Sequence, residues 1–279
     1  MVSVHTKLVA LLGSPLGFTM APAMHNTTYA ECGLDYLYFP VECSKADLPV
    51  LLSAFRRMNF AGFAVTKPLK MEIMGCLDEV TPLAAKIGAV NTVKNEGGRL
   101  VGYNTDGYGF AQSLYSAYGD YTGKTMFVFG VGGASRSLCF DCAERGIRRI
   151  YLCSRHENTL ASELIAKAGI EAIWIPQYTD AVPDYIAQSD ILVNASGVGM
   201  EPHLGETPVD SSVLRPDLFV CDLAYNPPAT RLLLDAEQAG CRTMNGLKMV
   251  AYQGARQFEI FTGKSAPYEK MLHIVEQAL

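Results

Sequence analysis

The stretch "VFGVGGASR", residues 128–136, places an apolar run, a glycine-rich turn and the start of a helical pattern one after another. A turn of this kind leads from a parallel strand into a helix and lets a phosphate group approach the amides at the helix N-terminus. The letters alone are a weak signal, because Ser135 stands where the usual fingerprint has its third glycine. An ordinary glycine turn is the alternative, but the complete strand–turn–helix context favours a dinucleotide-binding loop. Its backbone contacts are expected from Gly130, Gly132, Gly133 and Ala134.

The rest of the chain alternates short apolar runs with helical patterns, which is typical of α/β proteins with largely parallel sheets. Strands 84–95 and 98–107 should pair through a turn at the glycines between them. We expect the chain to change domains near 106–121 and again near 243–246. The other expected strands are 7–14, 36–43, 60–68, 148–155, 171–176, 190–196 and 218–225. Residues 124–146 are expected to form a strand, a turn and a helix. Further helices are expected at 21–33, 46–59, 160–168 and 246–263, and another from there to the C-terminus.

Composition narrows the class of protein. The 279 residues are 49% apolar and 18% charged, which suits a globular protein with a large core, and two domains are the default at this length. The net charge of -5 and pI near 5.6 offer no electrostatic footprint for nucleic acid or for an anionic membrane. The sequence shows no signal-peptide pattern and no apolar window as long as a membrane span. We therefore expect a cytoplasmic protein that binds neither nucleic acid nor membrane.

The eight cysteines are scattered among apolar neighbours, which suits reduced thiols. Cys139 and Cys142 form a C-x-x-C pair, but no second pair or nearby histidine completes a zinc site. On a helix this spacing puts both thiols on one face. We interpret them as packing residues, with a redox or metal role as the alternative, and expect no resident metal.

The end of the strand expected at 148–155 bears on the choice of nucleotide. In proteins that bind NAD, an acidic residue near this place contacts the ribose hydroxyls. Here the position is taken by Arg155, which can pair with the 2′-phosphate of NADP. Glu157 could still reach a ribose hydroxyl, and a solvated arginine on a loop is a further alternative. We predict NADP as the cofactor and leave NAD open.

Polar loops supply candidates for the chemistry that accompanies a nicotinamide cofactor. Such an enzyme needs an acid–base group for the alcohol proton and donors that orient the substrate. Each loop is expected to follow an apolar strand, where α/β domains expose their strand ends. A lysine and an aspartate held together would stabilise each other's charged forms, while burial opposes this. The candidates are Thr66 and Lys70 in "VTKPLK", Asn91 and Thr92 in "GAVNTV", and Asn104 and Asp106 in "YNTDG".

These residues complete a pattern that resembles the shikimate dehydrogenases and their quinate dehydrogenase and shikimate dehydrogenase-like relatives. The resemblance covers nearly the whole chain in order, through "GSPLGFTMAPAMHN", "VTKPLK", "GAVNT", "NTDG", "GVGGASR", "SR", "NAS", "CDLAYNPPAT" and "GLKMVAYQGARQF". It implies an α/β substrate domain in which the C-terminal helices complete the N-terminal part, residues 1–106 and 245–279. It also implies a Rossmann-type, doubly wound domain that binds NAD(P), residues 107–244.

The resemblance further implies roles for single residues. Lys70 and Asp106 would form the catalytic pair, with Lys70 assisting proton transfer at the reacting hydroxyl. The substrate would be contacted by Thr19, Thr66, Lys70, Asn91, Asp106, Tyr225 and Gln253. The cofactor would be bound, besides the glycine-rich turn, by Ser154, Arg155, Asn194, Ala195 and Met249.

The chain departs from the family where the substrate carboxylate is usually held. Two serines usually hold it, and they align here with Thr19, which can still donate a hydrogen bond, and Ala21, which cannot. The family's usual asparagine before Val-Thr is Ala64. Each missing contact costs roughly 1–3 kcal/mol if its partner stays unpaired. Lys248 could compensate as a cation, although a solvent-facing lysine is the alternative.

Three histidines have different expected environments. His156 stands in place of the threonine that relatives have beside Arg155. We interpret His25 as a buried, hydrogen-bonded residue of the first helix rather than as a base. His203 follows a proline in a loop and suggests no partner.

We therefore predict an NAD(P)-dependent oxidoreductase that moves a hydride between nicotinamide and a ring hydroxyl of shikimate or ring ketone of 3-dehydroshikimate, in aromatic amino acid biosynthesis. Quinate or another cyclic hydroxy acid is the second choice, because Ala21 and Ala64 alter the substrate site. The alternative from a different class is a non-catalytic NADP-sensing module, whose mark would be loss of the Lys70–Asp106 pair. The expected partner is a small cyclic hydroxy acid, and the protein is expected to be a monomer or homodimer.

Overall fold

The computed structural model describes residues 2–16 and 19–278, which form two compact units. The first unit contains residues 1–109 and 251–279, and the second contains residues 110–250. The chain leaves the first unit within helix α4 (Asp106–Tyr118) and returns to it within helix α9 (Leu247–Thr262). Among the described residues, no helix combines the length and the apolar character needed to cross a membrane.

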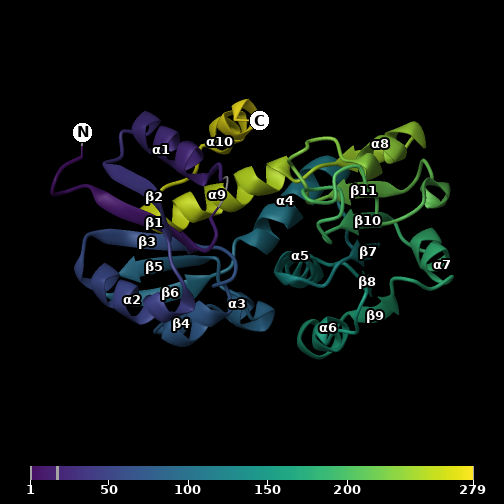
Figure 1. Ribbon diagram of the computed structural model, residues 1–279, viewed down its shortest axis with the longest axis horizontal. Coiled ribbons are helices and arrows are strands. Elements are labelled where there is room, and N and C mark those ends of the chain that lie inside the picture. The colour runs from purple at the N-terminus through teal and green to yellow at the C-terminus, as the bar shows by residue number, and fades with distance from the viewer. Residues whose placement is uncertain (1, 17–18, 279) are drawn as a thin grey trace. The chain divides into compact units, whose positions relative to one another are not determined.

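The first unit is built on a six-stranded sheet with the order β2-β1-β3-β5-β6-β4 (Figure 1). Strands β1, β2 and β3 are parallel, whereas β5 and β6 form an antiparallel hairpin. Gly97 and Gly98 make the hairpin turn with φ values of 65° and 100°, as the sequence predicts. The strands are β1 (Lys7–Gly13), β2 (Tyr36–Glu42), β3 (Phe60–Val65), β4 (Glu79–Val80), β5 (Thr92–Glu96) and β6 (Arg99–Tyr103).

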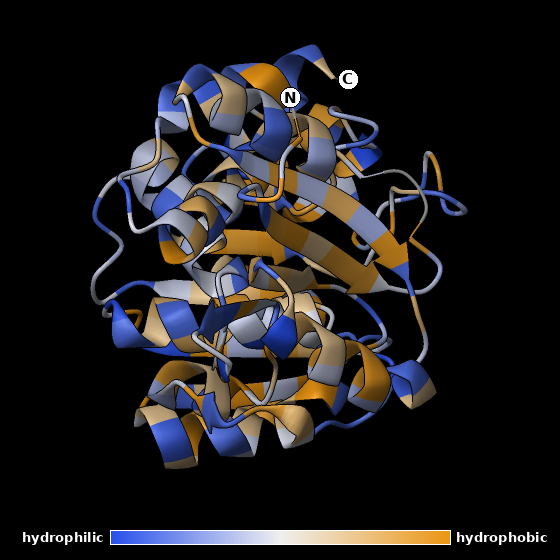
Figure 2. Cartoon of the chain, turned by 90° about the vertical axis from the view of Figure 1, so that its left-hand side faces the viewer, coloured by the Kyte–Doolittle hydropathy of each residue, from blue (hydrophilic) through white to orange (hydrophobic). Residues whose placement is uncertain are grey.

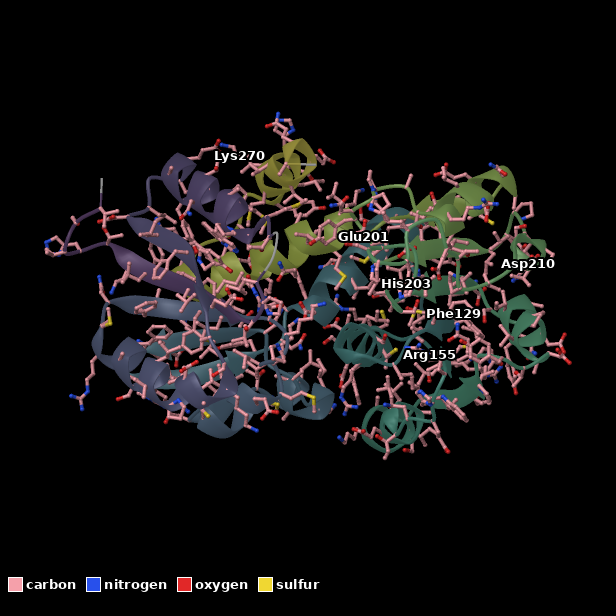
Figure 3. All side chains as sticks on the ribbon, in the orientation of Figure 1. Phe129, Arg155, Glu201, His203, Asp210 and Lys270 are labelled. Carbon is pink, nitrogen blue, oxygen red and sulfur yellow. The ribbon has the colours of Figure 1, made fainter. Side chains whose placement is uncertain are left out.

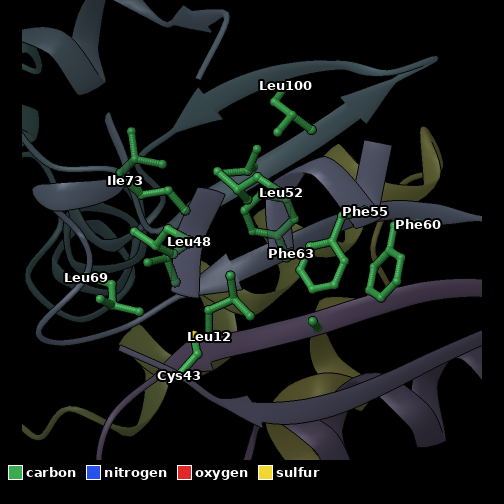
Figure 4. Packing of buried hydrophobic residues seen from close by; sticks show 14 of the residues in the cluster. Leu12, Cys43, Leu48, Leu52, Phe55, Phe60, Phe63, Leu69, Ile73 and Leu100 are labelled. Carbon is green, nitrogen blue, oxygen red and sulfur yellow. The ribbon is translucent and has the colours of Figure 1, made fainter. Parts of the chain in front are cut away.

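One face of this sheet packs against helix α2 (Figure 4). Leu48, Leu52 and Phe55 of α2 meet Phe63 and the other apolar strand residues in one buried cluster. Figure 2 shows the matching hydropathy, with apolar strands inside and polar residues on the outer turns of the helices. The helices around this sheet, besides α4 and α9, are α1 (Ala21–Glu31), α2 (Leu48–Arg57), α3 (Pro82–Ile87) and α10 (Tyr268–Gln277), with short 3-10 helices at Lys45–Asp47 and Glu72–Cys76.

The second unit contains a six-stranded, wholly parallel sheet with the order β12-β11-β10-β7-β8-β9. This is the doubly wound order in which the chain turns outward in both directions from β7, so the predicted α/β fold with a Rossmann-type domain is confirmed. The strands are β7 (Thr125–Phe129), β8 (Arg149–Ser154), β9 (Glu171–Pro176), β10 (Ile191–Asn194), β11 (Phe219–Asp222) and β12 (Arg242–Met244). The helices are α5 (Gly133–Glu144), α6 (Leu160–Ala168), α7 (Val182–Ala187) and α8 (Arg231–Gln238), with a 3-10 helix at Ser211–Val213.

One predicted element is wrong in part. The strand expected at 84–95 begins only at Thr92, because residues 84–87 belong to helix α3 and residues 88–91 to the loop that follows it. Gly88 ends that helix in the left-handed region at φ 75°, a common C-terminal stop. The apolar sequence of α3 resembles that of a strand, because the helix is too short to show the 3.6-residue period of apolar side chains.

Candidate active site

Lys70 and Asp106 lie in contact although they come from different loops. Lys70 Nζ is 2.6 Å from Asp106 Oδ2, and the two side chains are 27% and 12% exposed. Lys70 stands in the turn after β3, and Asp106 is the first residue of α4, directly after β6. The pair is thus shielded by protein but still open enough to exchange a proton with a small molecule.

Asn91 holds the other carboxylate oxygen. Its Nδ2 donates to Asp106 Oδ1 at 2.8 Å, and it is only 2% exposed. The backbone N–H of Thr105 donates to Asn91 Oδ1 at 2.8 Å. Because each oxygen of Asp106 has its own donor, the carboxylate is fixed in orientation.

The position of Asn91 and Thr92 corrects one expectation. They lie at the start of β5, not after a strand. Since β5 runs antiparallel to β3 and β6, Thr92 pairs with Ala64 near the end of β3 and with Tyr103 at the end of β6. The three loops therefore meet at one edge of the sheet.

Thr66 and Gln253 border this edge from two sides. Thr66 follows β3, and its methyl group occupies space left by Gly13, where an added Cβ would lie 2.4 Å from Thr66 Cγ2. Gln253 belongs to α9, and its Oε1 accepts a hydrogen bond of 3.5 Å from Thr105 Oγ1. Asn104 caps α4, because its Oδ1 accepts from the backbone N–H groups of the first residues of the helix.

The segment expected to hold a substrate carboxylate is described only in part, because residues 17 and 18 of "GSPLGFTMAPAMHN" lie outside the described residues. Thr19 Oγ1 accepts a 3.3 Å hydrogen bond from the backbone N–H of Ala21, where α1 begins. Ala64 is 2% exposed within β3. Neither alanine offers a side-chain hydrogen bond.

The glycine-rich turn of the second unit connects β7 to α5, as predicted. Gly130 has φ 93°, and a Cβ added there would lie 2.7 Å from the carbonyl oxygen of Ala195. Gly132, Gly133 and Ala134 are exposed, and an added Cβ at either glycine would meet nothing within 4 Å. Gly130 therefore serves the fold itself, whereas the other two glycines leave the N-terminus of α5 open.

This contrast gives a first prediction. Gly133→Ala should leave the melting temperature unchanged or slightly higher, because alanine is the better helix former, but should weaken NADP binding about ten-fold by crowding the phosphates. Gly130→Ala should lower the free energy of unfolding by about 2 kcal/mol, because it combines a left-handed backbone with a steric overlap. Thermal unfolding and a titration of the fluorescence of Trp174, the single tryptophan, measure both effects. Equal melting temperatures for the two variants would contradict the assignment.

The loop after β8 carries Arg155, which is exposed and labelled in Figure 3. Ser154 is occupied inside the protein, since its Oγ donates to the carbonyl oxygen of His156 at 2.7 Å and accepts from Trp174 Nε1 at 2.9 Å. His156 and Glu157 are exposed beside Arg155. Ser154 thus shapes the loop, and Arg155 presents the charge.

Asn194 likewise orders a loop. Its Nδ2 donates to the carbonyl oxygen of Val198 and to Asp222 Oδ2, and its Oδ1 accepts from the N–H and hydroxyl of Ser196. Asp222 also accepts from Thr230 Oγ1 at 2.8 Å, and burial raises the pKa of its carboxyl. The side chain of Asn194 is therefore engaged within the protein, and it positions Ala195 and the loop at the carboxyl edge of the parallel sheet.

The remaining site candidates of the second unit lie at 225 and 248–249. Tyr225 follows β11 and is half-buried, and burial raises the pKa of its phenol. Met249 is half-buried near the start of α9. Lys248 lines a pocket of about 270 Å³ together with Glu237, Asn245 and apolar residues of the same unit.

Two histidines differ from expectation. His25 is fully buried as predicted, but neither ring nitrogen makes a hydrogen bond within the described part of the chain. The ring stacks on Tyr38 with centroids 4.6 Å apart. His203 does have a partner, Glu206 Oε1 at 3.2 Å from Nδ1.

The thiols of Cys139 and Cys142 are both buried in α5, and burial raises their pKa values. All eight cysteines are free. No cluster of metal-ligating side chains occurs in residues 2–16 and 19–278.

Sequence reasoning missed several residues that hold the site. Thr105 and Gln257 connect to Asn91, while Trp174 and Asp222 order the loops of the second unit. Thr105 lies within "NTDG", so its motif was visible, although its partners were not. Gln257 follows Gln253 by one helical turn, which places both on one face of α9.

A doubly wound parallel sheet with an open glycine-rich turn, in one chain with a shielded Lys–Asp pair, defines a two-domain α/β protein of the nicotinamide-dependent dehydrogenase type. Residues 11–93 match the family model of the shikimate dehydrogenase substrate binding domain. Residues 246–276 match that of the shikimate 5′-dehydrogenase C-terminal domain. A shikimate dehydrogenase (NADP(+)) of Listeria monocytogenes is 39% identical, over 97% of this chain and 96% of that protein. The chain belongs to the shikimate dehydrogenase family.

Solved structures of a shikimate dehydrogenase and a quinate dehydrogenase have the same fold as this chain. Shikimate 5-dehydrogenase from Listeria monocytogenes, in complex with shikimate and NAD, has a TM-score of 0.95 and 37% identity, covering 100% of this chain and 98% of that one. Quinate dehydrogenase from Corynebacterium glutamicum, in complex with NAD, has a TM-score of 0.91 and 29% identity, covering 98% and 99%.

Proposed function

We propose that this protein is a shikimate dehydrogenase-like oxidoreductase that uses NADP, transferring a hydride reversibly between the nicotinamide and the ring carbon of shikimate or 3-dehydroshikimate. The observation that carries the proposal is the contact of Lys70 with Asp106, whose second oxygen is held by Asn91. This pair supplies the acid–base group that the oxidation of an alcohol by hydride transfer needs.

A bound nicotinamide would supply the acceptor for the hydride in oxidation and its donor in reduction. As the hydride leaves the carbon, the hydroxyl proton passes to Lys70 in its neutral amine form, which thereby becomes the ammonium that contacts Asp106. In the reverse direction Lys70 donates that proton to the carbonyl oxygen. Asp106 keeps Lys70 in place, because its ionised carboxylate receives a charge-assisted hydrogen bond.

We assign substrate binding to the first unit, through Thr66, Asn91, Asp106 and Gln253, and cofactor binding to the second. The open N-terminus of α5 and the exposed Arg155 support the second assignment. Thr19, Tyr225 and Met249 remain assigned by family resemblance. The free thiols support a reducing, cytoplasmic location, and the protein acts as a monomer or homodimer on a small cyclic hydroxy acid.

The test is a substrate panel followed at the nicotinamide absorbance band, with shikimate, quinate and related cyclic hydroxy acids, each with NADP and NAD. Turnover of shikimate with NADP well above the other pairs is expected. Quinate is the second candidate, favoured by the likeness to quinate dehydrogenase and by Ala21 and Ala64 in the substrate site. An NADP-sensing module would bind cofactor tightly and turn over no panel member.

Arg155 allows a separate prediction for the cofactor. Arg155→Ala should raise the KM for NADP about ten-fold or more and leave the KM for NAD nearly unchanged, because only NADP carries a 2′-phosphate. Arg148→Ala, at the other end of β8, is the matched control for loss of one cation and should change neither value. Equal weakening of both cofactors by Arg155→Ala would contradict the 2′-phosphate assignment.

A further inference from the structure

The buried amide of Gln257 lies at the start of a chain of hydrogen bonds that ends on Asp106. Gln257 Nε2 is 3.0 Å from Thr92 Oγ1, Thr92 Oγ1 is 2.8 Å from Asn91 Oδ1, and Asn91 Nδ2 is 2.8 Å from Asp106 Oδ1. Gln257 comes from α9 and Thr92 from β5, 165 positions apart. The exposed fractions of Gln257, Thr92 and Asn91 are 4%, 0% and 2%.

The direction of every bond in this chain follows from one backbone group. The N–H of Thr105 can only donate, and it lies 2.8 Å from Asn91 Oδ1. That atom is therefore the oxygen, so the adjacent Thr92 hydroxyl must donate its single hydrogen to it. The Thr92 oxygen is then left to accept, and the nitrogen of Gln257 donates to it at 3.0 Å, closer than the Thr105 hydroxyl at 3.4 Å.

The same chain decides which end of Asn91 faces the catalytic carboxylate. A rotated amide would place Asn91 Oδ1 against Asp106 Oδ1, and two acceptors at 2.8 Å repel. It would also place the NH₂ group against the N–H of Thr105. The Thr92 hydroxyl donates to the oxygen of Asn91 at 2.8 Å, closer than the Thr105 hydroxyl at 3.3 Å, and so disfavours the rotated state further. Burial excludes the water that could otherwise take over this task.

We propose that Thr92 and Gln257 are positioning residues for the reaction, which hold the Asn91 amide so that it donates to Asp106. Within residues 2–16 and 19–278, neither side chain is hydrogen-bonded to Lys70 or Asp106. The role rests on the proposed function, because it acts through the catalytic pair. It extends that function to a residue of α9 one turn beyond Gln253.

The test compares Thr92→Val, which keeps the shape and removes the hydroxyl, with Thr92→Ser, which keeps the hydroxyl. Thr92→Val should lower kcat for shikimate about ten-fold or more, and Thr92→Ser should restore turnover close to wild type. Gln257→Leu should lose a smaller factor, and most of its effect should vanish in the Thr92→Val background, because its shorter contact, at 3.0 Å, reaches Asn91 through Thr92, and only the 3.5 Å contact with the Asn91 carbonyl oxygen bypasses Thr92. Cofactor affinity, measured by Trp174 fluorescence, should stay constant in all variants.

Thr28→Val is the matched control. Thr28 is 0% exposed in the same unit, and its hydroxyl donates to the carbonyl oxygen of Met24 with no link to Asp106. It should keep wild-type kcat at temperatures where it is folded. Equal kcat values for Thr92→Val and Thr92→Ser would overturn the proposal. So would a double variant in which the kcat losses of Thr92→Val and Gln257→Leu multiply. If Thr92→Val does not fold, a wild-type kcat in Gln257→Leu would overturn the proposal instead.

A readout without turnover separates this proposal from the proposed function. In the protein without substrate, the side-chain amide protons of Asn91 should exchange with water at least ten-fold faster in Thr92→Val than in Thr92→Ser. Equal exchange overturns the positioning role, even in an enzyme that turns over shikimate. An inactive wild type overturns the proposed function, and the exchange rates still decide whether Thr92 holds Asn91.

Discussion

Lys70→Ala is expected to lower kcat for shikimate oxidation about a thousand-fold, because acid–base groups contribute on the order of 10²–10⁴ to such reactions. The ammonium lies 2.6 Å from Asp106 Oδ2, and no other lysine or arginine forms an ion pair with Asp106 among the described residues. Truncation leaves the proton of the reacting hydroxyl without a partner. It also leaves the Asp106 carboxylate without its cation. Stopped-flow measurement at the nicotinamide absorbance band gives the rate of the hydride step directly.

Lys67→Ala is the matched control, since Lys67 lies in the same turn and is exposed, whereas Lys70 is partly shielded. It removes one positive charge near the site and should leave kcat close to the wild-type value. Fluorescence of Trp174 should show unchanged cofactor affinity in both variants. Comparable turnover in Lys70→Ala and Lys67→Ala would refute the mechanism, because the reaction would then need no ammonium at residue 70.

The sequence predicts most of the fold because the signals are local. Gly33, Gly97, Gly98 and Gly263 follow or separate periodic segments, and all have positive φ in the structure. The apolar runs of the parallel sheet are continuous because both faces are buried. The strand expected at 84–95 is wrong at its start because residues 84–87, of which three are apolar or small, are too few to show whether the apolar period is that of a helix or of a strand.

The candidate site is predictable only as far as its motifs extend. Lys70 and Asp106 occur in recognisable loops, so their pairing is a reasonable expectation from the order of strands. The contact of Gln257 with Thr92 depends on the rotation of α9 against β5, which no local pattern contains. The bond from Trp174 to Ser154 depends on the register of β8 with β9, where Ser154 pairs with Pro176.

The second large predicted effect concerns His25 and the pH dependence of stability rather than turnover. Burial lowers the pKa of its imidazole from 6.5 to about 4, with a smaller opposing contribution from Gln257. The ring faces the phenols of Tyr29 and Tyr38 and the ring of Phe261, and none of these groups carries a charge at neutral pH. The folded protein therefore keeps His25 neutral well below the pH at which the unfolded chain protonates it.

The sign of the pH dependence follows from linkage. The unfolded chain binds the proton below about pH 6.5 and the folded protein only near pH 4, so stability is complete above pH 6.5 and decreases as the pH falls. The loss due to this one group reaches about 3 kcal/mol near pH 4. Urea unfolding at a series of pH values measures it. The difference between wild type and a variant isolates His25 from the carboxylates.

His25→Phe should remove this part of the slope, because a phenyl ring keeps the aromatic stacking and cannot bind a proton. Its free energy of unfolding should therefore decrease less than that of the wild type between pH 6.5 and pH 4. His5→Phe, which replaces an exposed imidazole, should keep the wild-type slope. If His25→Phe and His5→Phe give the same slope of unfolding free energy against pH, the prediction is wrong. His25 would then already be protonated in the folded protein at pH 5, and it would need a buried counter-charge that the aromatic cluster does not provide.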